Sequence, residues 1–290
     1  MSSCIVGERQ EGEAKAMNNK RLSEFAVSCL LPPWVFCSSL ANLALMFPKL
    51  NSMVIISCRF RDRFIHPLID WYDNEHAPAR LTVPGFSNAA RYKATDAQIP
   101  SWVGNFESAS PSIASWVAIY EIASPSIAYS EPYKALSLQA SEREKSLIPR
   151  LALLNRRVYE PLTVKTRPGF STSDLPGKYL LVVTFLVQPE LDEEFNNWYE
   201  QEHIPDLSKV PGWQRARRYK LDSSVELARG PAATPENPVH NYLTLHDWDR
   251  DGYLTFPEFT AAIVTPWSAK MLQGVKAFSG RPFALHKDIK

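Results

Sequence analysis

Residues 70–93 read DWYDNEHAPARLTVPGFSNAARYK, and residues 197–220 read NWYEQEHIPDLSKVPGWQRARRYK. The two stretches align without a gap at an offset of 127 residues, and 12 of the 24 positions are identical. Agreement of this kind at a fixed spacing is typical of an internal repeat. The sequence therefore predicts two tandem copies of one structural unit.

The flanks of the repeated stretch carry the same pattern of elements in both copies. A β-branched apolar run precedes a helix with apolar residues at i, i+3 and i+4, and turn signals and two more strands follow. Pro78 and Pro205 are expected to end the first helices. The predicted second helices are 131–153 and 257–274. The predicted strands are 54–60, 89–94, 116–122 and 157–164 in the first copy and 179–187, 215–221, 242–248 and 277–286 in the second.

This element order, strand, helix, strand, strand, helix, strand, is the ferredoxin-like βαββαβ pattern. The predicted fold class is α+β, with two tandem ferredoxin-like units whose antiparallel sheets pack as a pseudo-dimeric α+β barrel. The predicted domains are an N-terminal extension 1–52, a first unit 53–164, a linker 165–178 rich in Pro, Gly, Ser and Thr, and a second unit 179–288.

The N-terminal extension differs from the rest of the chain and has three open interpretations. It starts with polar and charged residues and continues with an apolar run from 26 to 50 that Pro32 and Pro33 interrupt. A poorly ordered extension, even a mis-assigned start before Met53, is the plainest interpretation. A membrane anchor would need an uninterrupted helix of about 20 apolar residues. A secretory signal would start earlier and would not follow acidic residues.

The composition argues against nucleic-acid and membrane partners and favours a reducing compartment. The chain has 290 residues and a net charge of +1, so no global field attracts nucleic acid or an anionic membrane. The cysteines are Cys4, Cys29, Cys37 and Cys58, without CxxC spacing, which favours free thiols of a reducing, cytoplasmic compartment. No nucleotide-binding glycine pattern, HExxH or GxSxG motif occurs.

The candidate catalytic residues are a Glu-His pair in each copy, Glu75 with His76 and Glu202 with His203. The pairs occupy the i+7 and i+8 places of the helical stripe, where the periodicity predicts apolar residues. A buried ionisable pair must find partners or face a cavity, and an imidazole can shuttle protons near neutral pH. The alternative is a histidine that caps the last helical carbonyls.

Aromatic and basic residues near these pairs are the candidate substrate-binding groups. Trp71, Tyr72, Trp198 and Tyr199 lie on the helical stripe and serve equally well as core residues. On the second strands, Arg alternates with Tyr, so one member of each pair points into the predicted sheet interface. An inward arginine would need an anionic partner, and an outward one would be solvated. These residues are Arg91, Tyr92, Arg218 and Tyr219.

An acidic stretch, residues 247–258 (DWDRDGYLTFPE), fits the spacing of an EF-hand calcium loop. The residues at the ligand positions are Asp247, Asp249, Asp251 and Glu258. An EF-hand needs an incoming helix, however, whereas the preceding residues alternate like a strand. We therefore interpret the match as an acidic strand-to-helix turn and expect no metal site.

The segments WYDNEHAPARLTVPGF and WYEQEHIPDLSKVPGW resemble the EthD-like branch of the dimeric α+β barrel superfamily, in its fungal tandem-repeat form. The likeness extends over most of residues 53–288. The resemblance implies a barrel with an interior pocket, with His76 and His203 as the candidate acid/base groups and Glu75 and Glu202 beside them. It does not say which copy is functional.

We therefore expect a cofactor-independent enzyme of secondary metabolism that acts on a phenolic or polyketide-like molecule by His-mediated proton transfer, with decarboxylation as the favoured reaction. Cofactor-free monooxygenation or cyclisation is the alternative within the superfamily, and a non-catalytic ligand-binding or stress-response barrel is the alternative outside it. No cofactor, nucleic acid or membrane partner is expected, and a homo-oligomer stays open. Both imidazoles are expected to face one shared apolar hollow between the two copies.

Overall fold

The structure is a computed structural model, and it describes residues 50–59, 65–95, 114–228 and 239–289. Of the N-terminal extension, only residues 50–52 are among them, so the three interpretations of this segment concern residues outside the described ranges. Within the described ranges, no helix has the length and apolar character needed to cross a membrane.

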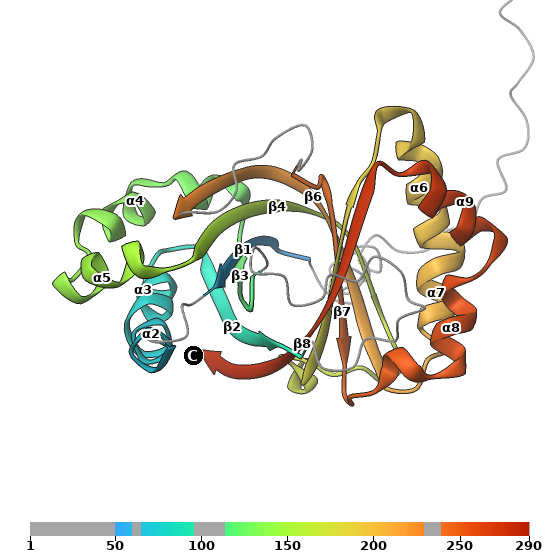
Figure 1. Cartoon of the computed structure of the whole chain (residues 1–290), viewed down its shortest axis with the longest axis horizontal. Helices are drawn as coiled ribbons and strands as arrows, with labels where there is room; N and C mark the ends of the chain where they lie inside the picture. The colour runs from blue at the N-terminus through green and yellow to red at the C-terminus, as the bar shows by residue number, and fades with distance from the viewer. Residues whose placement is uncertain (1–49, 60–64, 96–113, 229–238, 290) are drawn as a thin grey trace, which may run out of the picture. The chain divides into compact units, whose positions relative to one another are not determined.

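The eight described strands form a closed antiparallel barrel with the order β1-β3-β2-β8-β5-β7-β6-β4 (Figure 1). Closure leaves no unpaired strand edge. Strands β2 and β8, and strands β4 and β6, join the N-terminal and C-terminal halves of the barrel. The strands are β1 Ser52–Arg59, β2 Phe86–Ala94, β3 Trp116–Ile122, β4 Leu153–Thr166, β5 Tyr179–Leu186, β6 Trp213–Ala228, β7 Tyr242–Trp248 and β8 Ala277–Ile289.

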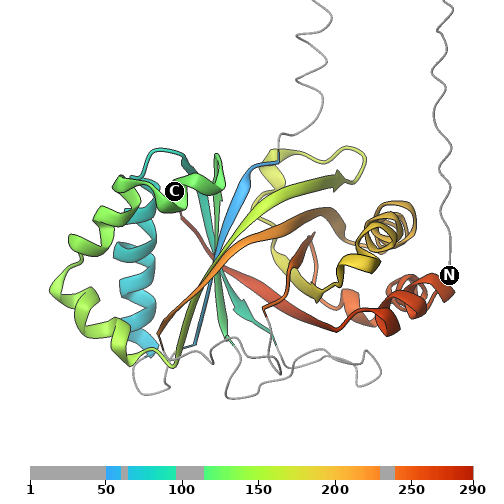
Figure 2. The same cartoon turned by 90° about the horizontal axis from the view of Figure 1, so that it is seen from above.

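Helices cover the barrel on two sides. Those of the N-terminal half lie on one side and those of the C-terminal half on the other, as both views show (Figures 1 and 2). The α-helices are α2 Ile65–Trp71, α3 Ala77–Leu81, α4 Glu131–Leu138, α5 Glu142–Leu147, α6 Asp192–Trp198, α7 Ile204–Leu207, α8 Pro257–Ile263 and α9 Pro266–Gly274. Two π-helical turns, η2 Tyr72–His76 and η9 Tyr199–His203, connect α2 to α3 and α6 to α7.

Strand alternation separates three apolar cores. In β7, for example, Leu243 and Leu245 point into the barrel, whereas Trp248 packs under the helices. All eight strands contribute to the barrel core, which includes Tyr92 and Tyr219. The other two cores lie between the barrel wall and the helices of each half. The molecule therefore has two helix-to-sheet layers, and the barrel interior is distinct from both.

The first helix of each half does not end at the proline, which corrects the expectation for Pro78 and Pro205. Both prolines lie inside the helices that follow the π turns, α3 and α7. In the π turn, the amide of Ala77 bonds to the carbonyl of Tyr72, five residues earlier. A π turn holds one residue more than an α turn, so the proline ring avoids the carbonyl four residues earlier.

The structure also corrects the expected shared hollow. His76 lies in the layer beneath the helices of the N-terminal half, and His203 lies in the corresponding layer of the C-terminal half. The barrel wall separates the two layers, because a strand presents successive residues to opposite faces. Each histidine therefore has its own environment.

Candidate active site

His76 is held by an acidic partner in the first layer. Its ring packs against Trp71 and Tyr72, with centroids 4.5 and 4.8 Å away. Nδ1 of His76 lies 3.2 Å from a carboxylate oxygen of Glu144 in α5, and Arg80 lies 3.7 Å from the other oxygen. Burial and the charge of Arg80 lower the pKa of His76 to about 4, although Glu144 acts in the opposite direction.

His203 is buried without such an acid. Its ring stacks on Trp198 at a centroid distance of 4.3 Å and contacts Tyr199 edge-on at 5.1 Å. No salt bridge joins it to any residue of the described ranges, and the main-chain carbonyl of Ala262 is the polar group that favours its protonation. Burial, with a smaller contribution from His246, lowers the pKa of His203 to about 3.

A cavity of about 240 Å³ lies beside His203 in the second layer. Its wall combines apolar side chains of β5 and α8 with His246 of β7 and Ser268 of α9. Val264 also lines the cavity and is 62% exposed, so the cavity reaches the surface there. Two imidazoles, one hydroxyl and several aromatic rings therefore surround a space that suits a small flat molecule.

His246 is the residue that sequence reasoning missed. Its Nδ1 lies 3.4 Å from the indole nitrogen of Trp213, whereas its Nε2 is buried without a hydrogen-bond partner in the described part of the chain. Burial lowers the pKa of His246 to about 4. The signal was present: His246 stands in the third strand of its copy where Tyr120 stands in the other, WVAIYEI against YLTLHDW.

Ser268 accounts for the room beside His203. It is the third residue after the N-cap Thr265, and Glu144 is the third residue after the N-cap Ser141. The indole nitrogen of Trp198 donates to the Ser268 hydroxyl at 3.2 Å. A serine in place of a glutamate thus removes the acid and leaves space in the second layer.

Within the described residues, neither candidate glutamate forms a hydrogen bond or an ion pair with an imidazole. Glu75 accepts a hydrogen bond from the N-cap Ser141, and Glu202 accepts one from the N-cap Thr265 at 2.5 Å. Each glutamate thus ties the first helix of its half to the start of another helix.

Arg91 and Arg218 point beneath the helices, and both bind protein carboxylates. Arg91 pairs with Asp73 and lies under the ring of Tyr72, with 4.2 Å between its Cζ and the centroid. Arg218 donates to Glu200 at 3.0 Å, with its Cζ 4.3 Å from the centroid of Tyr199. The neighbouring Tyr92 and Tyr219 point into the barrel, so the predicted alternation is observed.

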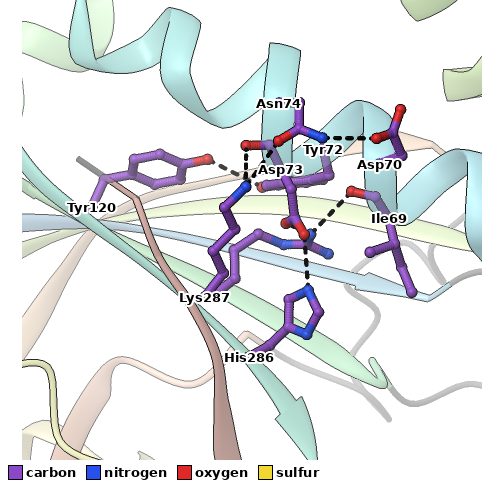
Figure 3. A network of polar contacts seen from close by, with 9 residues as sticks. Ile69, Asp70, Tyr72, Asp73, Asn74, Tyr120, His286 and Lys287 are labelled. Atoms are coloured by element: carbon purple, nitrogen blue, oxygen red, sulfur yellow. Dashed lines mark hydrogen bonds and ion pairs between the residues drawn. The ribbon is translucent and has the colours of Figure 1, made fainter.

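The Asp73 network joins the two halves of the barrel (Figure 3). His286 of β8 lies 2.8 Å from Asp73, and Lys287 donates to Asn74 at 2.9 Å. The hydroxyls of Tyr72 and Tyr120 lie 3.3 Å apart in the same region. Trp71 and Tyr72 belong to the first apolar core, and Trp198 and Tyr199 belong to the second.

The acidic stretch 247–258 begins with the last two residues of strand β7 and ends in the first turn of α8. Asp247, the residue at the first ligand position, is fully buried and accepts from Arg215 at 2.7 Å. Asp249 pairs with Arg250 at 3.0 Å. Asp251 accepts from the amide of Gly252 at 2.7 Å, and Glu258 lies in the first turn of α8. The described residues contain no cluster of three or more groups that could hold a metal ion.

Comparisons with known proteins relate the chain to others through its fold. No family model and no curated protein matches it. An anthrone oxidase-like protein of known structure aligns with a TM-score of 0.52 at 10% identity, over 83% of this chain and 93% of that one. A monooxygenase candidate from Fusobacterium nucleatum subsp. nucleatum aligns at 0.46 and 8% identity, over 84% of this chain and 96% of that one. Chlorite dismutase from Candidatus Nitrospira defluvii aligns with a TM-score of 0.47 at 10% identity, over 85% of this chain and 95% of that one. The chain thus shares its overall fold with the anthrone oxidase-like protein.

Proposed function

We propose that the cavity of the second layer binds a small aromatic or phenolic molecule and that His203 removes a proton from it, with His246 as its neighbour. The observation that carries this proposal is the pair of buried imidazoles beside a cavity of about 240 Å³. Trp198 holds the ring of His203 in place by stacking. A fixed imidazole at a cavity wall is a suitable proton acceptor.

The lowered pKa values of His203 and His246 keep both imidazoles unprotonated and therefore available as proton acceptors, and they also make both imidazoles weaker bases than free histidine. With pKa values of about 3 and 4, His203 and His246 are both neutral near pH 7. A neutral imidazole can accept a proton from an acidic phenol or an activated ring CH₂. The anion that remains is electron-rich and reacts with O₂. The balanced overall change converts one CH₂ and one O₂ into one C=O and one water, without an added reductant.

Cofactor-independent monooxygenation therefore takes precedence over decarboxylation in this proposal. Loss of CO₂ from an aromatic acid requires a proton to be delivered to the ring carbon. Histidines with pKa values of about 3 and 4 are poor proton donors at neutral pH because they are rarely protonated. One structural neighbour is an anthrone oxidase-like protein, which agrees with an oxidation.

The first layer serves as the structural counterpart in this proposal. Glu144 contacts both the imidazole of His76 and the guanidinium group of Arg80 beneath α5. Tyr120 occupies the strand position that His246 has in the other half. We therefore assign the activity to the C-terminal half.

The test compares His203→Gln with its counterpart His76→Gln, using anthrone as the probe for oxygen uptake and 1-hydroxy-2-naphthoate as the probe for CO₂ release. Oxygen uptake and CO₂ release are measured with the purified full chain, and melting curves check that each variant folds. Loss of oxygen uptake in His203→Gln alone supports the proposal, with an expected decrease of about 100-fold or more. Equal turnover in both variants would refute it, and CO₂ release without oxygen uptake would restore decarboxylation. Binding without turnover in the unmodified chain would indicate a ligand-binding barrel.

We also infer that the two halves arose by tandem duplication of a ferredoxin-like unit of the EthD-like branch. The sequence repeat at residues 70–93 and 197–220 supports this origin. A π turn that ends at the histidine of each copy is a further similarity. As part of the same proposal, we infer that the protein acts in secondary metabolism and that its substrate is a polyketide-like molecule.

A further inference from the structure

A second cavity, of about 690 Å³, opens at one mouth of the barrel. Its wall includes residues of β2, β3, β6 and β8, together with Thr172, Leu175 and Pro176 of the segment that connects the halves. This cavity lies on the barrel side of the strands, whereas His203 lies on the helix side. In β7, His246 faces the cavity beside His203. The adjacent Asp247 points into the barrel, where it pairs with arginines that line the cavity at the barrel mouth.

Two arginines of β6 are fixed at the wall of this cavity by one buried carboxylate. Asp247 accepts from Nε of Arg215 at 2.7 Å and from a terminal nitrogen of Arg217 at 3.2 Å. Burial alone would raise the pKa of Asp247, but Arg215 and Arg217 hold it below its usual value. The carboxylate therefore stays ionised and orients both guanidinium groups.

The cavity wall has more fixed hydrogen-bond donors than the surrounding carboxylates use. Within the described residues, Arg215 donates only through Nε, so its two terminal nitrogens have no acceptor. Arg217 is 3% exposed, and its Nε also lacks a partner there. Glu121 accepts from Asn88 at 3.0 Å and lies 3.6 Å from Arg217. Asp288 also lines the cavity, and it is not free, because it already interacts with another group.

Apolar side chains complete the cavity. Ile119, Val164 and Leu175 line it, and Ala90 contributes a small side chain. Gly177 brings the connecting segment against the buried acid, because a Cβ on Gly177 would lie 2.8 Å from Cβ of Asp247. A ligand with an anionic head and an apolar body would match both parts of this wall.

We propose that the barrel mouth is a second ligand site, which takes a small organic acid whose anionic group binds Arg215 and Arg217. A guanidinium fork binds a carboxylate or sulfonate through paired, charge-assisted hydrogen bonds. The site is independent of the His203 cavity, so it stands whether or not that cavity is catalytic.

Titration calorimetry with 2-naphthoate, and with 2-naphthamide as the uncharged, non-phenolic analogue, tests this proposal on the full chain. We expect 2-naphthoate to bind at least about tenfold more tightly than 2-naphthamide, because only the anion engages the guanidinium groups. Arg215→Lys keeps a charge beside Asp247 but removes the fork, and it should weaken 2-naphthoate by about tenfold. Arg143→Lys, which changes an exposed arginine of α5, is the matched control.

A second variant separates loss of the site from loss of the fold. Ala90→Trp fills the mouth and leaves Arg215, Arg217 and Asp247 unchanged, and it should abolish 2-naphthoate binding while the melting temperature stays close to that of the unmodified chain. His203→Gln should leave 2-naphthoate binding unchanged. No binding of 2-naphthoate, equal binding of the two probes, or full binding by folded Arg215→Lys and Ala90→Trp would each overturn the proposal.

Discussion

The two helix-to-sheet layers share a backbone plan and differ in what surrounds the histidine. In the first layer, Glu144 pairs with Arg80 and contacts the imidazole of His76. In the second, Ser268 and His246 replace the acid and a tyrosine, and a cavity adjoins His203. The comparison shows that a few side chains on the second helix and the third strand decide whether this histidine is a packed residue or the wall of a site.

Making the second layer resemble the first should have the largest effect. Ser268→Glu would place a carboxylate in the cavity beside His203, where it would occupy the space and raise the pKa of the imidazole. We expect turnover of the proposed aromatic substrate to fall by about 100-fold or more, measured as oxygen uptake. Gln273→Glu adds the same charge on the exposed face of α9 and should leave turnover unchanged. Full activity in Ser268→Glu would mean that the cavity is not the site.

The reverse exchange tests the structural role of the first layer. Glu144→Ser removes the partner of both His76 and Arg80, and we expect it to lower the free energy of unfolding by about 2–3 kcal/mol. Chemical denaturation measures this loss. Glu142→Ser, two residues earlier on the exposed face of α5, should lower the free energy of unfolding by well under about 1 kcal/mol. Similar losses in the two variants would show that the buried network contributes little.

The pH dependence of stability should also differ between the layers. His203 and His246 have folded-state pKa values of about 3 and 4, below their unfolded value, so the unfolded chain binds more protons as the pH falls. Their stabilising contribution is complete above about pH 6.5 and is lost as the pH falls towards these values, by at most roughly 1.4 kcal/mol per pH unit and histidine.

Removing these histidines should flatten the profile. Replacing both His203 and His246 with Gln should reduce the slope between about pH 6 and pH 4.5 by about twice as much as His76→Gln does, because the second layer holds two such groups. Denaturation at a series of pH values measures the slope. An unchanged slope in the double variant would mean that these imidazoles remain as accessible to protons as in the unfolded chain.

The smallest effect is expected at the contact between the halves. The side chain of His286 is 31% exposed and lies 2.8 Å from Asp73. Because the contact is partly solvated, His286→Ala should lower the free energy of unfolding by only about 0.5–1 kcal/mol. A loss of several kcal/mol would show instead that this contact holds the barrel closed. His66→Ala, outside the network, is the control.

The strands, the barrel and the alternation of Arg91 with Tyr92 could be predicted from the sequence, because apolar periodicity and the internal repeat report directly on which face is buried. The separation of Glu202 from His203 could not. Helical periodicity assumes an i→i+4 turn, and the π turn at Tyr199–His203 changes the spacing. The sequence feature that indicates the π turn is the proline two residues after each histidine, Pro78 and Pro205.

The cavity itself could be predicted only in part. The sequence identified His203 and Trp198, which come from one helix, but Ser268 and His246 come from other elements, and tertiary contacts alone bring them together. The assumption of one pocket shared by both copies failed for a related reason. Alternation along a strand shows that the sheet has two faces, but it does not show that helices cover one face while the barrel interior lies on the other.

Because the π turn contains one residue more than an α turn, a deletion there changes the structure in a way that a substitution cannot. Loss of a single codon within residues 199–203 would restore an ordinary helical turn and rotate the preceding helix by about 100° relative to the imidazole. The aromatic stack on that ring would then be broken in one genetic step. One half of the molecule could therefore lose this arrangement of ring and helix while the barrel stays intact.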